Sequence, residues 1–227
     1  MGRITKKTVD FLKEIKKNNN KPWFEANRSK YEASHEEMIT FAESLMLEMN
    51  KIDNLVPMTG KKSLFRIYRD VRFSKDKTPY KHHWGGRMKR DTVWLRGGYY
   101  FHIEHNEAFI ASGFWNPEKA DLKLIRDNIA ADAESLRKII NSKQFKDVWS
   151  NLEGDKLKTA PKGYDKEHPD IDLLRHKQFI VSRKFSQKEM LSQDFVNHCV
   201  QSFKALRHFL DYMSEILTHD LNGQPLY

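Results

Sequence analysis

The chain has 227 residues, of which 39% are hydrophobic, 31% charged and 12% aromatic, enough apolar material for a sizeable core. This composition excludes a disordered chain, a collagen-like fibre and a repeat array, and no segment has the apolar length of a membrane span or the apolar core of a signal peptide. A single cysteine, Cys199, excludes an internal disulfide framework and a cysteine-based zinc site, so we expect a soluble, cytoplasmic protein.

The positive charge is concentrated in one segment. Residues 61–96 contain twelve Lys or Arg and three Asp, and therefore carry the whole net charge of +9, while the rest of the chain is balanced. A focused positive patch attracts anionic partners. The alternative is that acidic residues elsewhere in the fold, such as those at 104–107, neutralise the segment in space.

The first fifty residues predict two helices. Apolar residues recur at helical spacing over residues 4–15, and the three asparagines at 18–20 interrupt the pattern. Asn20 is a candidate N-cap for a second helix that has Pro22 in its first turn and runs to Met49. Residues 53–63 form a polar connection.

From Leu64 to Phe73 the pattern has a period of two, which predicts a strand. Arg69 lands on its apolar side, where a buried arginine–carboxylate pair is the expected solution. A loop over residues 75–91 and a second strand from near Thr92 follow. Residues 99–105 and 108–112 predict a hairpin that turns at residues 106–107.

The second half of the chain is mainly helical. Helical spacing continues over residues 117–149, a turn-rich loop covers residues 153–172, residues 179–181 predict a strand, and a last helix spans residues 194–219. Because strands and helices do not alternate regularly, the order predicts an α+β fold, with an antiparallel sheet packed against N- and C-terminal helices. We expect a single domain over residues 1–227.

The predicted strand and its loop hold the candidate site. Alternate positions, about 7 Å apart, would align Arg66, Tyr68, Asp70 and Arg72 on one face. An arginine pair at that spacing suits a phosphate or carboxylate ligand, and two guanidiniums would lower the pKa of Asp70 and keep it ionised. A salt-bridge ladder on an exposed sheet face is the alternative.

The chemistry of these side chains divides them into two groups, with no metal ligand among them. The predicted catalytic residues are Asp70, Asp76, Tyr80 and His82. The predicted anion-binding residues are Arg66, Arg69, Arg72, Ser74, Lys77, Lys81, Lys162 and Lys177. The sequence leaves any cofactor unknown.

The motif RIYRDVRFSKDKTPYK, with NNNKPWFEANRSKYE before it and APKGY and LLRHKQF after it, resembles the domain of unknown function 2461 family, whose members are mostly bacterial. The resemblance covers almost the whole chain and implies an α+β domain in the cytoplasm, but no particular activity. The family's motif positions map onto Trp23, Phe24, Arg66, Arg69, Asp70, Arg72, Ser74, Asp76, Lys77, Tyr80, Lys81, Pro161, Lys162, Gly163, Tyr164 and Lys177.

Three functions remain open from the sequence. The leading hypothesis is a compact basic site for a phosphorylated or carboxylated small molecule, with or without catalysis. The second is nucleic-acid binding, because Tyr68, Phe73, Tyr80, Trp84 and Trp94 are interleaved with the basic residues. The third is docking of an acidic protein partner.

The histidines also suggest a metal site. His102 and Glu104 share a strand face that His82 and His83 could approach, and two histidines with a carboxylate form a metal-ligand set. The spacing of the histidines matches no metal motif, so surface or partly buried histidines are the favoured interpretation.

Overall fold

The structure is a computed structural model that describes residues 2–226, and it confirms the α+β class. One antiparallel sheet has the strand order β1-β2-β3-β4. The strands are β1 (His83–Lys89), β2 (Gly98–Glu104), β3 (Glu107–Phe114) and β4 (Phe179–Ser186). The helices are α1 (Lys6–Lys17), α2 (Lys21–Ala26), α3 (Arg28–Met49), α4 (Gly60–Ser63), α5 (Lys119–Ala131), α6 (Glu134–Asn141), α7 (Lys143–Trp149), α8 (Ile171–Leu174), α9 (Gln187–Met190), α10 (Phe195–Ala205) and α11 (Arg207–Thr218).

The chain divides into two compact units, each built from three segments. The first comprises residues 2–88, 100–110 and 184–201, and the second comprises residues 89–99, 111–183 and 202–226. The chain passes from one unit to the other inside β1, β2, β3, β4 and α10. The single domain expected from the sequence stays a prediction.

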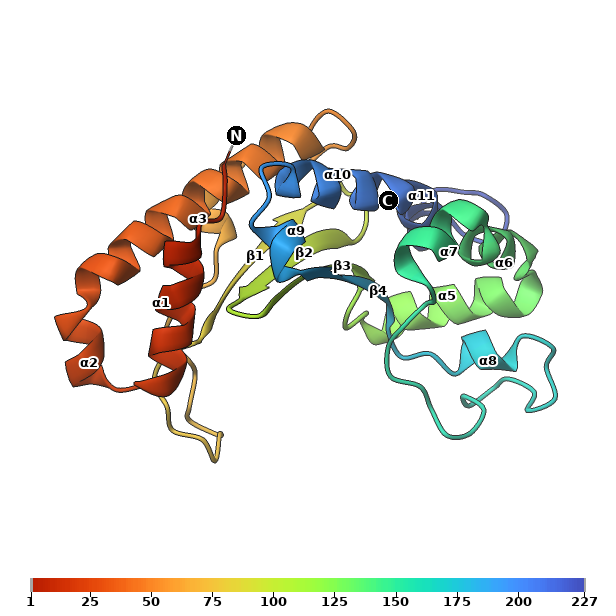
Figure 1. The fold of residues 1–227 in the computed structure, drawn as a ribbon. Coiled ribbons are helices and arrows are strands. Elements are labelled where there is room, and N and C mark those ends of the chain that lie inside the picture. Colours follow the sequence, from red (N-terminus) through yellow and green to blue (C-terminus); the bar gives the residue numbers. More distant parts are fainter. Residues whose placement is uncertain (1, 227) are drawn as a thin grey trace. The chain divides into compact units, whose positions relative to one another are not determined.

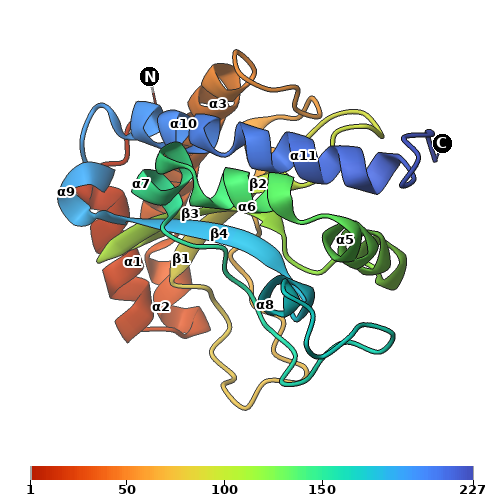
Figure 2. The same cartoon turned by 90° about the vertical axis from the view of Figure 1, so that its right-hand side faces the viewer.

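In the first unit, α3 and α10 cover one side of the strands (Figure 1 and Figure 2). The Phe41 ring of α3 meets Phe101 of β2 edge-on at 5.3 Å and stacks on Phe195 of α10 at 5.6 Å. All three rings are buried, and each such ring stabilises the fold by about 1.5–3 kcal/mol through removal of its surface from water. Because side chains alternate along a strand, burial of Phe101 and Ile103 leaves Tyr100, His102 and Glu104 of β2 on the opposite side.

In the second unit, α11 packs against α5 and α6. Rings from three elements form its core: Trp149 stacks on Phe203 at 6.2 Å, and Phe145 meets Phe209 at 6.2 Å. Arg90 is completely buried and donates hydrogen bonds to Ser214 Oγ at 3.0 Å and to the Asp211 carboxylate of α11. No helix among residues 2–226 is long and apolar enough to cross a membrane.

The expected strand over residues 64–73 is absent. Only two isolated antiparallel bridges form there, Leu64 with Gly86 and Tyr68 with Tyr80. The alternation is misleading because Ile67 is buried, whereas the Phe73 side chain is 97% exposed. Beyond Tyr68 the charged side chains bond within the loop: Arg69 pairs with Asp76, Arg72 pairs with Asp70, and Lys77 donates to a backbone carbonyl.

The prediction of a strand from near Thr92 is also wrong. Thr92 lies in a turn with φ of 71°, and the strand in this part of the chain is β1, which ends before it. The sequence places Gly85 and Gly86 in a loop, yet they lie inside β1 because neighbouring rings need the space. A Cβ atom at Gly86 would come within 2.4 Å of the Phe101 ring, and one at Gly85 within 2.9 Å of Tyr100 Oη.

Two expected long helices are each interrupted. Asn20 caps α2 as predicted, since its side chain accepts a hydrogen bond from the Trp23 backbone N–H at 3.0 Å. The helix then breaks at Asn27, before α3. The C-terminal helix breaks at Leu206, between α10 and α11. Periodicity misses both breaks because the apolar spacing continues across them.

Candidate functional site

Residues 64–82, named here the basic loop, are anchored to the connection between α1 and α2. The Asn19 side chain makes two hydrogen bonds with the backbone of Tyr80: Nδ2 donates to its carbonyl at 2.8 Å, and Oδ1 accepts from its N–H at 3.0 Å. The Tyr80 ring is buried and stacks on Phe24 at 4.2 Å. Burial raises the pKa of Tyr80. This predicted catalytic residue is thus part of the packing that positions the loop.

A network within the loop involves Arg69 and Asp76. The guanidinium of Arg69 is paired with the Asp76 carboxylate at 2.6 Å and also donates to Thr78, both to its carbonyl at 3.0 Å and to its hydroxyl. The Thr78 N–H donates to Asp76 Oδ1 at 2.9 Å, and this bond, with those from the Thr78 hydroxyl and Arg69, lowers the pKa of Asp76 to about 2. The expected arginine–carboxylate pair exists, although Arg69 is only partly buried.

A second carboxylate in the loop is neutralised in the same way. Arg72 donates two hydrogen bonds to Asp70, at 3.0 and 2.7 Å, and both side chains are exposed. The hydrogen bonds from Arg72 and the charge of Arg66 lower the pKa of Asp70, in the direction expected from the sequence. Asp70 is therefore ionised and already paired. This favours a role for Asp70 and Arg72 in the shape of the loop.

Two lysines of the loop bond to backbone carbonyls instead of carboxylates. Lys81 Nζ donates to the carbonyl of Arg66 at 2.5 Å and to that of Tyr68 at 3.1 Å, and Lys77 Nζ donates to that of Val71 at 2.9 Å. These bonds orient the ammonium groups without neutralising them. Burial, and then the nearby charge of Arg66, lower the pKa of Lys81. Arg66 is exposed and has no ion-pair partner among residues 2–226.

Ser74, Lys162 and Lys177 are the remaining predicted anion ligands. Ser74 is near the tip of the loop, where its N–H donates to the Val71 carbonyl at 3.3 Å. Lys162 and Lys177 belong to the second unit, where Lys162 is exposed and Lys177 pairs with Asp155 at 3.5 Å.

The pairing between the two sides of the loop contains a bulge beside the histidines. Between the two bridges, residues 65–67 on one side face residues 81–85 on the other, so two extra residues lie on the side that includes His82 and His83. His83 stacks on His102 of β2 at 4.2 Å, and His82 Nδ1 lies 3.3 Å from the Glu104 carboxylate. Burial, and then the charges of His102, His82 and Lys81, lower the pKa of His83 to about 4.

The bulge brings together the four residues that the metal hypothesis singled out, and adds Tyr100. Tyr100 Oη lies 3.0 Å from His102 Nδ1, and His102 Nε2 lies 3.7 Å from Glu104. In the part of the chain that the structure describes, no group of three histidine, cysteine or carboxylate side chains is arranged to hold a metal ion. The period of two over residues 99–105 was the signal for this set, since it places Tyr100, His102 and Glu104 on one face.

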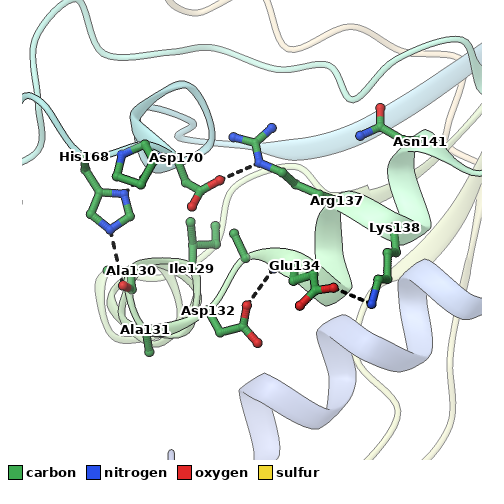
Figure 3. Close-up of a pocket in the computed structure, with 12 residues that line it drawn as sticks. Ile129, Ala130, Ala131, Asp132, Glu134, Arg137, Lys138, Asn141, His168 and Asp170 are labelled. Atoms are coloured by element: carbon green, nitrogen blue, oxygen red, sulfur yellow. Dashed lines mark hydrogen bonds and ion pairs between the residues drawn. The ribbon is translucent and has the colours of Figure 1, made fainter.

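A pocket lies in the second unit, between α5, α6 and the segment before α8 (Figure 3). It has a volume of about 610 Å³. Its cations are already paired: Arg137 with Asp170 at 2.5 Å and with Asp172 at 2.6 Å, and Lys138 with Glu134 at 2.5 Å. This pocket therefore offers no free positive charge to an anion.

The fold and the basic loop define an α+β protein with a polar cluster on one side of its sheet. Residues 7–212 match the family described as conserved hypothetical protein (DUF2461), and the chain belongs to that family, as the resemblance of its motifs indicated. No curated protein and no solved structure matches the chain significantly.

Proposed function

We propose that the basic loop binds a phosphorylated or carboxylated small molecule, with Arg66 and Lys81 as its principal ligands. One observation carries the proposal. Lys81 Nζ donates to the backbone carbonyl of Arg66 at 2.5 Å, and neither side chain is paired with a carboxylate among residues 2–226; burial, and then the charge of Arg66, lower the pKa of Lys81. An anion placed between them would relieve their repulsion and gain charge-assisted hydrogen bonds.

The other predicted site residues of the basic loop differ in whether they are already paired with an opposite charge. Arg69, Asp70, Arg72 and Asp76 are committed to pairs that shape the loop. Lys77 donates to a backbone carbonyl and not to a carboxylate, and is therefore a further candidate contact for a larger ligand. The proposed site is therefore narrower than the twelve basic residues of segment 61–96 suggest.

Calorimetry with inorganic phosphate, pyrophosphate and citrate tests this proposal. Arg66→Gln should weaken binding by roughly 10- to 100-fold, since a hydrogen bond to a charged group contributes about 1.5–3 kcal/mol. Arg72→Gln is the matched control, because it removes an equal charge that is already paired with Asp70. Equal effects of the two substitutions would show that only the general charge of the loop matters. Binding unchanged by Arg66→Gln would refute the proposed site.

Nucleic-acid binding is the second candidate, favoured by the exposure of Tyr68 and Phe73 on the basic loop. Fewer side chains are available to contact nucleic acid than the sequence suggests, because Tyr80, Trp84 and Arg90 are buried. Fluorescence anisotropy with single- and double-stranded oligonucleotides distinguishes the two candidates. Binding that persists near physiological salt, with a steep salt dependence, would support nucleic acid, and its absence would exclude it.

A further inference from the structure

Three side chains on the open side of β2 form a chain of polar contacts. Tyr100 Oη lies 3.0 Å from His102 Nδ1, and the other nitrogen of that ring lies 3.7 Å from Glu104 Oε2. The order hydroxyl, imidazole, carboxylate follows from the sequence, because every second residue of a strand projects to the same side. In this order a hydroxyl has a base beside it, and the base has a carboxylate behind it.

The neighbouring side chains hold this geometry in place. The His102 ring is stacked between Phe109 of β3 at 4.5 Å and His83 of β1 at 4.2 Å, which fixes its plane. The Tyr100 ring stacks on Phe65 at 6.1 Å, and its hydroxyl occupies the space left by the missing side chain of Gly85. The imidazole therefore needs no rearrangement to reach the tyrosine.

The carboxylate is also held from outside the strand. Lys16 Nζ of α1 donates to Glu104 Oε1 at 2.8 Å, and His82 lies against the same oxygen. Burial alone would raise the pKa of Glu104, but the Lys16 hydrogen bond and the charges of His82, Lys16 and His102 lower it overall. Burial lowers the pKa of His102. At neutral pH the set is therefore a hydroxyl, a neutral imidazole and a carboxylate.

We propose that Tyr100, His102 and Glu104 form a proton-transfer triad, in which Tyr100 is the group that meets the substrate and His102 is the base behind it. As Tyr100 takes a proton from a substrate hydroxyl, its own proton passes to His102 Nδ1. The resulting imidazolium faces Glu104, which acts as a positioning residue. One proton moves from the substrate to His102, and no bond other than O–H and N–H changes. The reaction class is general acid–base catalysis at a hydroxyl oxygen.

The triad itself does not depend on the proposed anion site. The test therefore uses a small neutral reagent, N-acetylimidazole, which transfers its acetyl group to tyrosine oxygen. The C–N bond of the reagent breaks, an ester C–O bond forms, and the tyrosine proton leaves through His102 to the departing imidazole.

Tyr68 provides an internal control, because its side chain is half-exposed and its ring contacts no histidine among residues 2–226, whereas burial raises the pKa of Tyr100. Peptide mass spectrometry gives the acetylation rate of each residue in the same sample. Burial alone predicts that Tyr100 reacts more slowly than Tyr68. The triad predicts that it reacts several-fold faster, and that His102→Gln lowers its rate at least tenfold while the rate of Tyr68 is unchanged.

Two further variants separate proton transfer from packing. Gly85→Ala places a methyl group against Tyr100 Oη and should abolish the enhanced rate, with the fold checked by circular dichroism. Glu104→Gln should move the midpoint of the rate–pH profile to lower pH, because the Glu104 charge raises the pKa of His102. Lys16, Lys81, His82, His83 and Glu107 also surround the triad and are kept unchanged in this comparison.

The outcomes are decisive in both directions. Fast acetylation of Tyr100 that depends on His102 would support the triad even if phosphate and citrate fail to bind. A Tyr100 that reacts more slowly than Tyr68, or at a rate unaffected by His102→Gln, would refute the triad whatever the anion measurements show.

Discussion

The three consecutive asparagines at 18–20 have different contacts, so truncating each one tests how the basic loop is held. Asn19 makes two hydrogen bonds to the backbone of the buried Tyr80. Asn19→Ala leaves that N–H and carbonyl without partners, and at about 1–1.5 kcal/mol for each bond the unfolding free energy should fall by about 2–3 kcal/mol. Asn20→Ala removes a helix cap and should cost about 1 kcal/mol. Asn18→Ala removes one exposed bond and should cost about 0.5 kcal/mol or less.

Thermal unfolding and limited proteolysis measure these differences. For a chain of this size Asn19→Ala should lower the Tm by roughly 4–12 °C. If the loop detaches locally, tryptic cleavage after Lys81 should accelerate by roughly 30- to 150-fold, which corresponds to the same 2–3 kcal/mol. Cleavage and stability changes of equal size in Asn18→Ala and Asn19→Ala would show that the contact with Tyr80 does not hold the loop.

Three other predictions follow from buried groups. Gly86→Ala places a Cβ atom 2.4 Å from the Phe101 ring and should lower the unfolding free energy by about 1–3 kcal/mol in urea denaturation; a neutral result would mean that the ring moves freely. Arg90→Gln breaks the buried bonds to Asp211 and should cost about 2 kcal/mol or more in the same assay, whereas a charge on a surface patch would cost almost nothing. The pKa of His83, about 4 in the folded protein against an ordinary value near 6.5, means that the unfolded chain binds its proton first; stability should therefore fall as the pH drops from about 6.5 to 4, and His83→Asn should flatten that fall.

Much of the fold is predictable because it depends on local patterns. The apolar spacing of α1, the Asn20 cap of α2 and the alternation of β2 and β3 each specify one element, and the structure confirms them. The pattern fails where tertiary contacts decide the outcome. Gly85 and Gly86 are typical of a loop in isolation, yet β1 needs them because rings from β2 occupy the space beside them.

The candidate site is harder to predict because a count of cations overstates the charge available to a ligand. The sequence treats Arg66 and Arg72 as an equivalent pair of ligands, but a loop that folds back on itself pairs Arg72 with Asp70, as it pairs Arg69 with Asp76. The hydrogen bonds of Lys81 go to backbone carbonyls and not to a carboxylate, which no side-chain pattern encodes.

The contacts of the histidines are also hard to predict from the sequence. A bulge of two residues between isolated bridges has no periodic signature, and it decides that His83 stacks on His102. The sequence does show that Tyr100, His102 and Glu104 share a face. The packing of Phe65, Gly85 and Phe109 against these side chains brings the Tyr100 hydroxyl into contact with the His102 ring. Alternation thus selects which residues can meet, and the contacts across the sheet decide which atoms do.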